Sequence, residues 1–159
     1  GWEVMHLPGH AGSQSCFYQV ESRAFLASDM LLRRTPTPVI EPPQNDMPRV
    51  PALPQYVDSL YRVADLDIRT VYPGHGQSFN DAGGVIERQL ARIAQRKREC
   101  LEHVRQGTHT VYGLHERMYP PAAFVNMAGL WMLVGYLDLL QKEGLIGMEV
   151  RDGLWWYQV

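Results

Sequence analysis

Three short, mostly apolar stretches lie near the start of the chain, at residues 2–7, 16–20 and 24–27, and the first of them alternates between apolar and polar residues. Alternation with a period of two is typical of strands that are buried on one face. The first stretch stops at a Pro-Gly pair, and polar residues at 21–23 separate the other two. We therefore predict a strand followed by a β-hairpin, which ends at Ser28 and Asp29.

Further along the chain, apolar residues recur at helical spacing. The pattern predicts a helix that begins at Pro54, a short strand over residues 68–72, and helices over residues 85–106, 110–118 and 122–143. The helix before Gly107 and the one before Gly144 each end at a glycine, which is a common helix terminator.

The last two apolar stretches, residues 146–150 and 154–159, flank an Arg-Asp-Gly sequence that favours a hairpin turn. Three helices followed by a β-hairpin is the element order of a winged helix. We therefore divide the chain into residues 1–84 and residues 85–159, with the second part formed by a helical linker and a winged-helix domain.

Proline is concentrated in one segment near the middle of residues 1–84. Seven of the 11 prolines lie between Pro36 and Pro54. A central strand cannot contain so many residues that lack a backbone N–H. We predict a long, mostly extended connection, which is either a functional loop or a plain linker.

Composition narrows the class of protein. The chain has 159 residues, a net charge of −2, 45% hydrophobic residues and 20% charged residues, as in a soluble globular protein. The near-zero charge provides no general attraction to nucleic acid or anionic lipid. The only cysteines, Cys16 and Cys100, lie among apolar residues and indicate buried thiols rather than a disulfide framework.

The first ten residues lack the charged head and apolar run of a signal peptide, and we expect a cytoplasmic protein. The chain does not begin with Met, so we also expect it to be a portion of a longer protein.

Three residues with metal-ligating side chains follow predicted strands: His10, Asp29 and His75. Each histidine follows a Pro-Gly pair, and glycine allows the backbone to approach a ligand closely. Two imidazoles and a carboxylate suit zinc or iron. Taken singly, each residue is also an ordinary turn or cap residue, so the order of the three carries the interpretation.

The residues around these three side chains extend the pattern. His6-Leu7-Pro8-Gly9-His10 precedes a hairpin, Ser28-Asp29 follows it, and Val71-Tyr72-Pro73-Gly74-His75-Gly76 comes after the next helix. This series resembles the C-terminal half of the metallo-β-lactamase superfamily, in particular the glyoxalase II-like and β-lactamase-like hydrolases with a C-terminal winged helix. The resemblance implies an α/β (α+β) fold, the C-terminal half of an αββα sandwich followed by a winged-helix module.

The resemblance also implies roles for single residues. His10 and His75 match metal ligands, and Asp29 matches the aspartate that bridges two metals, usually zinc. His6 and Ser28 would lie next to these ligands. The sequence departs from the family pattern at Ser28, where glycine is usual, and at residues 11–14, which follow His10.

A larger departure is that this sequence contains no His-x-His-x-Asp-His motif, which supplies the other ligands in the family. We therefore expect the missing N-terminal half of the same protein as a partner, a partial zinc site here, and an inactive isolated segment. With one or two zinc ions the complete protein would hydrolyse a small-molecule ester, thioester, lactam or phosphodiester through metal-bound hydroxide. We also expect a homodimer, because an apolar sheet face would lack its partner.

Two other functions stay open. A winged helix could bind nucleic acid, but residues 122–140 contain no cation, and a contact through that helix is disfavoured. The run is also too short to cross a membrane. Basic residues lie instead on the preceding helix, where Arg92 and Arg96 are candidate contacts to an anionic ligand and a solvated face is the alternative. The third function is a non-catalytic dimerisation segment.

Overall fold

A computed structural model describes residues 1–40, 49–119 and 127–159. The chain divides into two compact units, Gly1–Arg92 and Ile93–Val159, which are described separately below. The division lies within α2 (Ala82–Arg105), the helix that the sequence analysis placed at the start of the second part.

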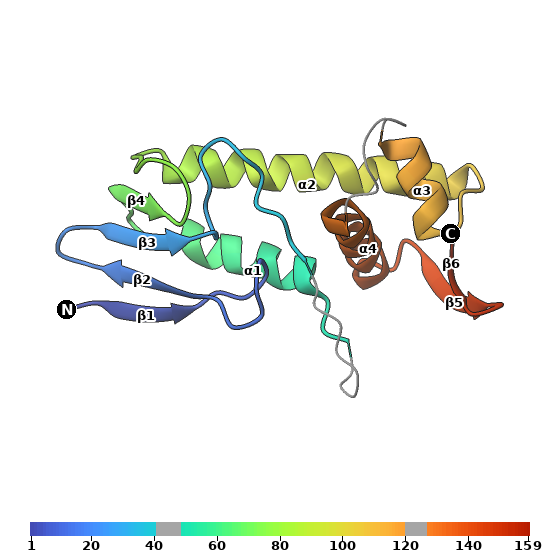
Figure 1. Cartoon of the computed structure of the whole chain (residues 1–159), viewed down its shortest axis with the longest axis horizontal. Coiled ribbons are helices and arrows are strands. Elements are labelled where there is room, and N and C mark those ends of the chain that lie inside the picture. Colours follow the sequence, from blue (N-terminus) through green and yellow to red (C-terminus); the bar gives the residue numbers. More distant parts are fainter. Residues whose placement is uncertain (41–48, 120–126) are drawn as a thin grey trace. The chain divides into compact units, whose positions relative to one another are not determined.

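The first unit is built on a four-stranded sheet with the order β1-β2-β3-β4, formed by β1 (Glu3–His6), β2 (Ser15–Gln19), β3 (Ala24–Ser28) and β4 (Thr70–Pro73). The predicted hairpin is confirmed, because β2 and β3 pair antiparallel; β1 also pairs antiparallel with β2, and β4 pairs parallel with β3. A parallel pair needs a crossover connection, and here the crossover contains α1 (Ala52–Ala64) (Figure 1).

Alternation along the strands separates a buried face from an exposed one. Met5, Cys16, Phe25 and Val71 are all at most 9% exposed. The buried side of α1, which includes Leu53, Tyr56, Leu60 and Val63, completes this core. The opposite face of the sheet carries exposed apolar side chains.

The helix α1 begins at Ala52, two residues before the predicted start at Pro54. Proline is compatible with the first turn because the N–H groups there have no partner within the helix. The described part of the proline-rich connection contains no helix or strand before Ala52, in agreement with the prediction.

The second unit contains the rest of α2, then α3 (Val111–Met118), α4 (Met127–Lys142) and a hairpin of β5 (Gly147–Arg151) and β6 (Leu154–Gln158). The side chain of Thr110 caps α3 by accepting a hydrogen bond from the backbone N–H of Gly113, at 3.1 Å. Asp152 and Gly153 both have positive φ, as a two-residue hairpin turn requires.

The predicted order of three helices and a hairpin is therefore present, and the winged-helix assignment stays a prediction. Residues 122–126, the predicted start of the long apolar helix, lie outside the described residues. Within this helix, residues 133–140 are all buried. Across the described parts of the chain, we find no helix with the length and apolar character to cross a membrane.

Candidate metal centre

Asp29 lies directly after β3, beside the end of the parallel strand β4. Ser28 pairs with Pro73 in the strand register, and the N–H of Gly74 donates a 2.7 Å hydrogen bond to the Ser28 carbonyl. Because the two strands run in the same direction, their ends lie at the same edge of the sheet. His75, one residue beyond Gly74, is thereby brought next to Asp29.

His10 reaches the same place from the loop between β1 and β2. A 2.9 Å hydrogen bond from the N–H of Leu7 to the Gln14 carbonyl closes the loop. Ser59 of α1 donates a 2.8 Å hydrogen bond to the Pro8 carbonyl. Gly9 has φ of +145° and lies so close to α1 that a Cβ would be 2.4 Å from the Cβ of Tyr56. The loop is thus fixed against the helix, which sets the direction of His10.

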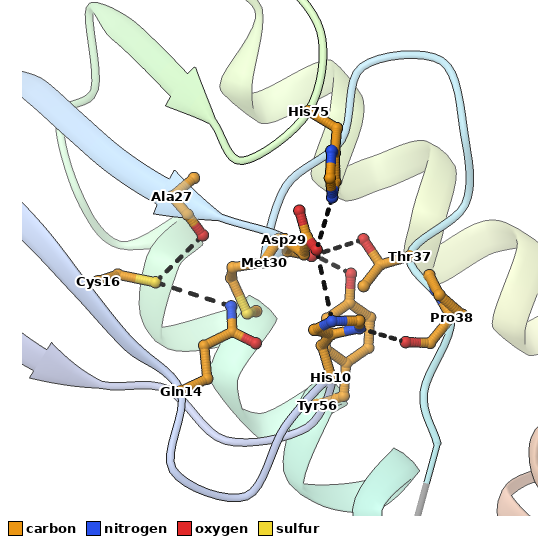
Figure 2. Close-up of polar contacts among 10 residues, drawn as sticks. All are labelled: His10, Gln14, Cys16, Ala27, Asp29, Met30, Thr37, Pro38, Tyr56 and His75. Atoms are coloured by element: carbon orange, nitrogen blue, oxygen red, sulfur yellow. Dashed lines mark hydrogen bonds and ion pairs between the residues drawn. The ribbon is translucent and has the colours of Figure 1, made fainter.

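The three side chains meet at one carboxylate oxygen. The Nε2 atom of His10 and the Nε2 atom of His75 each lie 3.4 Å from Asp29 Oδ2, and Figure 2 shows Asp29 between the two imidazoles. The side chains of His10 and Asp29 are 27% and 18% exposed, whereas that of His75 is 78% exposed. One side of this cluster is therefore embedded in the fold and the other is open to a ligand.

A backbone carbonyl fixes the tautomer of the neutral His10 ring. Its Nδ1 atom lies 2.7 Å from the carbonyl oxygen of Pro38 (Figure 2). Because a carbonyl only accepts hydrogen bonds, Nδ1 must carry the proton, and Nε2 of the neutral ring holds the lone pair. Metal-ligating histidines commonly donate their second N–H to a carbonyl in this way.

The backbone around Asp29 is held by two hydroxyl groups. Thr37 donates a 2.9 Å hydrogen bond to the Asp29 carbonyl, and the buried Tyr56 hydroxyl lies 3.0 Å from the Met30 carbonyl (Figure 2). Tyr56 is also hydrogen-bonded to Gln89. Burial raises the pKa of the Tyr56 phenol well above its usual value, so the hydroxyl stays a donor at all physiological pH values.

The sequence analysis missed Thr37, Pro38 and Tyr56 as supporting residues. The first two lie in the proline-rich connection, which has no periodicity from which contacts could be inferred. One signal was available, because an extended, proline-rich segment leaves its carbonyl groups without ladder partners and free to accept other hydrogen bonds.

This donor set fits a metal ion. The lone pair of His10 Nε2 faces a carboxylate oxygen, and two acceptors in contact need a cation or a proton between them. Asp29 Oδ1 is buried and has no hydrogen-bond partner among the described residues. Two ligands at 2.0–2.2 Å from one tetrahedral zinc ion are roughly 3.3–3.5 Å apart, close to both separations measured here.

The set is nevertheless incomplete. Within residues 1–40, 49–119 and 127–159, no group of three or more His, Cys, Asp or Glu side chains is arranged to hold one metal ion. The geometry is that of two imidazole–carboxylate pairs sharing Asp29, rather than three ligands around one point. Zinc sites use four ligands, so each pair would need further ligands from outside the described residues.

The two residues expected next to the ligands have separate positions. Ser28 immediately precedes Asp29 and has φ of +47°, a left-handed conformation that favours glycine. The Nε2 atom of His6 lies 2.9 Å from the Gly12 carbonyl, so this exposed histidine contacts the loop that carries His10.

The cations of α2 are partly engaged by neighbouring groups. Arg96 forms a 2.6 Å ion pair with Glu99, donates a 3.2 Å hydrogen bond to the Met118 carbonyl and stacks over the ring of Tyr119. Arg92 is exposed. The contacts of Arg96 place it within the packing of the second unit.

The other histidines support the second unit. His109 Nδ1 lies 2.7 Å from the Tyr157 carbonyl, and its ring stacks on Trp156 with centroids 4.6 Å apart. The buried His115 stacks on Tyr119 with centroids 4.9 Å apart. These contacts show that both histidines pack within the second unit.

Comparisons with known proteins give relatives along nearly the whole chain. It is 29% identical over 149 residues to the Bacillus subtilis protein named Probable metallo-hydrolase YqjP, covering 92% of this chain and 46% of that protein. It is 31% identical to Lactamase-like protein GME11357 of Pestalotiopsis microspora, covering 94% of this chain and 48% of that protein. The chain thus spans about half the length of the curated relatives it matches.

Among solved structures, a metallo-beta-lactamase family protein from Thermus thermophilus is similar with a TM-score of 0.81 and 25% sequence identity. The match covers 99% of this chain and 48% of that protein. No protein-family model matches the chain.

Proposed function

Because this chain belongs to the metallo-β-lactamase superfamily, we propose that it supplies part of the metal site of a hydrolase. Asp29 would bridge two metal ions, and His10 and His75 would each bind one of them. The observation that carries this proposal is the contact of both imidazoles with the same carboxylate oxygen, at 3.4 Å each, from three loops far apart in the sequence.

The bound metal would supply Lewis-acid chemistry and would lower the pKa of a water molecule to about 7. The chain's own residues would prepare the site. Pro38 holds His10 in the tautomer that leaves Nε2 free, and Thr37 and Tyr56 hold the backbone on which Asp29 is mounted. Such supporting contacts orient ligands and increase metal affinity. The exposed His75 side would face the substrate.

The substrate class we propose is a small molecule with an ester, thioester, lactam or phosphodiester bond. The remaining metal ligands would come from a segment that precedes this chain in a longer protein, so the 159 residues alone would bind zinc weakly and would not turn over substrate. Zinc is the proposed metal because two imidazoles and a carboxylate suit it, although the same donors also suit iron.

Metal analysis of the longer protein tests the proposal. We expect His10→Ala and His75→Ala each to lower the bound metal by about one ion per chain, and Asp29→Asn to remove both. His103→Ala, in the second unit, is the matched control and should keep the full metal content. Unchanged metal content in all three site variants would show that these residues are not ligands.

Hydrolysis assays with the four bond types then identify the reaction. Loss of metal and loss of activity should occur together in the site variants. If one of the bonds is cleaved equally fast by the wild type and by metal-free protein, the proposal of metal-dependent hydrolysis is wrong.

A further inference from the structure

A cavity of about 440 Å³ lies beside the candidate metal centre. Its lining comes from residues 32–35, which follow Asp29, and from residues 75–77, which include His75. These are the same two loops that place Asp29 and His75 at the end of the sheet. A ligand in this cavity would therefore contact His75, the exposed member of the cluster.

Two cations line this cavity. Arg33 and Arg34 are both exposed, and neither guanidinium has a hydrogen-bond or ion-pair partner within the described parts of the chain. Several other arginines of the chain are paired with carboxylates, namely Arg23, Arg88, Arg96 and Arg151. The described lining of the cavity contains no Asp or Glu, so two positive charges stay uncompensated there.

The backbone that carries these arginines is fixed at both ends. Leu31 and Leu32, which precede the bend at residues 33–35, are 0% and 9% exposed. Thr37, which follows the bend, is 4% exposed and donates its hydrogen bond to the Asp29 carbonyl. Both arginines therefore lie on a short bend whose ends are anchored, one of them directly to the backbone of Asp29, the candidate bridging ligand.

We propose that Arg33 and Arg34 bind a phosphate group of the substrate in this cavity. Planar guanidinium groups form bidentate, charge-assisted hydrogen bonds with phosphate, and two of them match a dianion. The hydroxyl of Thr35 and the amide of Gln77, which also line the cavity, add neutral donors. This inference rests on the proposed function in one respect, because the bond to be cleaved would lie beside His75. The anion site itself needs no metal.

Binding of inorganic phosphate to the metal-free longer protein tests the site directly, because no metal is then present to bind the anion. We expect titration calorimetry to show saturable binding that R33Q/R34Q weakens by about tenfold or more. R105Q is the control, since Arg105 is also exposed, lies at the end of α2 and does not line the cavity. Equal affinity in wild type and R33Q/R34Q would overturn the proposal, as would an equal loss in R105Q.

Acetate at the same ionic strength distinguishes phosphate from other oxyanions. We expect it to bind at least about tenfold more weakly than phosphate, because it carries one charge and forms fewer hydrogen bonds. Equal binding of acetate would overturn the assignment to phosphate.

Kinetics separate this inference from the proposed function. With a phosphate-bearing ester, R33Q/R34Q should raise KM with little change in kcat, and a neutral ester should show the same KM in wild type and variant. If the metal-loaded protein hydrolyses both esters and the variant changes neither KM, the anion site is wrong while the hydrolase stands. If phosphate binding depends on the two arginines but no ester is cleaved, the hydrolase is wrong while the anion site stands.

Discussion

Gly74 lies against the carboxylate of Asp29: a Cβ built on Gly74 would be 2.5 Å from Asp29 Oδ1 and 3.2 Å from the carbonyl carbon of Ser28. The N–H of Gly74 donates to the Ser28 carbonyl at 2.7 Å, so the two backbone segments are tied together at this point. A side chain at position 74 would force either the carboxylate or the backbone to move.

Replacing Gly74 with alanine should therefore weaken metal binding. We expect Gly74→Ala to lower the metal affinity of the longer protein by roughly 10–100-fold, as for loss of a contact that orients a ligand. Gly12→Ala is the control, because a Cβ on Gly12 has no neighbour within 4 Å. Competition with a chromophoric chelator measures both. Equal affinities for the two variants would contradict the steric argument.

Ser28 has a conformation better suited to glycine, with φ of +47°. A left-handed conformation costs a non-glycine residue about 1–2 kcal/mol, and glycine loses about 0.5–1 kcal/mol in conformational entropy on folding. We expect Ser28→Gly to raise the free energy of unfolding by about 0.5–1 kcal/mol, measured by urea denaturation. Ser15→Gly, in strand β2, is the control and should lower it. A lower stability for Ser28→Gly would refute this explanation.

Sequence patterns predicted the helices and strands but not the contacts between them. The apolar stretches at residues 2–7, 16–20 and 24–27 predicted three strands, whereas the side that is buried, with Met5, Cys16 and Phe25, is seen only in the structure. The proximity of His10, Asp29 and His75 followed only from their order and from the resemblance to a family, because no local pattern encodes the pairing of β3 with β4. Their role as ligands stays a prediction.

The connection after Asp29 could not be predicted in detail. Arg33, Arg34, Thr37 and Pro38 lie in a segment without helix or strand, where side-chain direction depends on tertiary contacts. The anchors of this segment are the Thr37 hydrogen bond to Asp29 and the burial of Leu31. The sequence pattern therefore predicted anion contacts only on the more regular helix α2, at Arg92 and Arg96.

The two cysteines are buried thiols, as predicted. Burial raises the pKa of the Cys16 thiol from 9.0 to about 11 and that of the Cys100 thiol to about 12, because the thiolate loses its hydration. The folded state therefore holds these protons more tightly than the unfolded state. The contribution of the two protonated thiols to the free energy of unfolding is complete below pH 9 and is lost as the pH rises toward 11.

This predicts the response of the thiols to pH and to alkylation. At about pH 8, iodoacetamide should modify neither cysteine in the folded protein and both in urea, as mass spectrometry would show. Between pH 9 and 11, the free energy of unfolding should fall less steeply in Cys16→Ala/Cys100→Ala than in the wild type. Rapid alkylation of the folded protein under the same conditions would be inconsistent with the burial of these thiols.

The sheet of the first unit has an exposed apolar row on its second face. Val4 pairs with Phe17, Phe17 with Leu26, and Leu26 with Tyr72, so one side chain from each strand contributes to the row. These side chains are 66%, 39%, 38% and 48% exposed, in the order of the strands. Apolar patches of this kind mark surfaces that associate with other protein surfaces. In the sandwich that we propose for the longer protein, a second sheet would cover this row.

Lysine at two positions of the row should prevent self-association of the isolated chain but destabilise the longer protein. In the chain of 159 residues alone, we expect self-association of the wild type and a monomeric Phe17→Lys/Leu26→Lys variant, measured by light scattering. In the longer protein, the same substitutions should lower the free energy of unfolding by several kcal/mol, because they would bury unpaired charges between two sheets. Val20→Lys/Val159→Lys, which changes two exposed valines outside the row, should have neither effect. A wild-type chain that stays monomeric at high concentration, or a longer protein that tolerates both lysines, would show that this face has no partner.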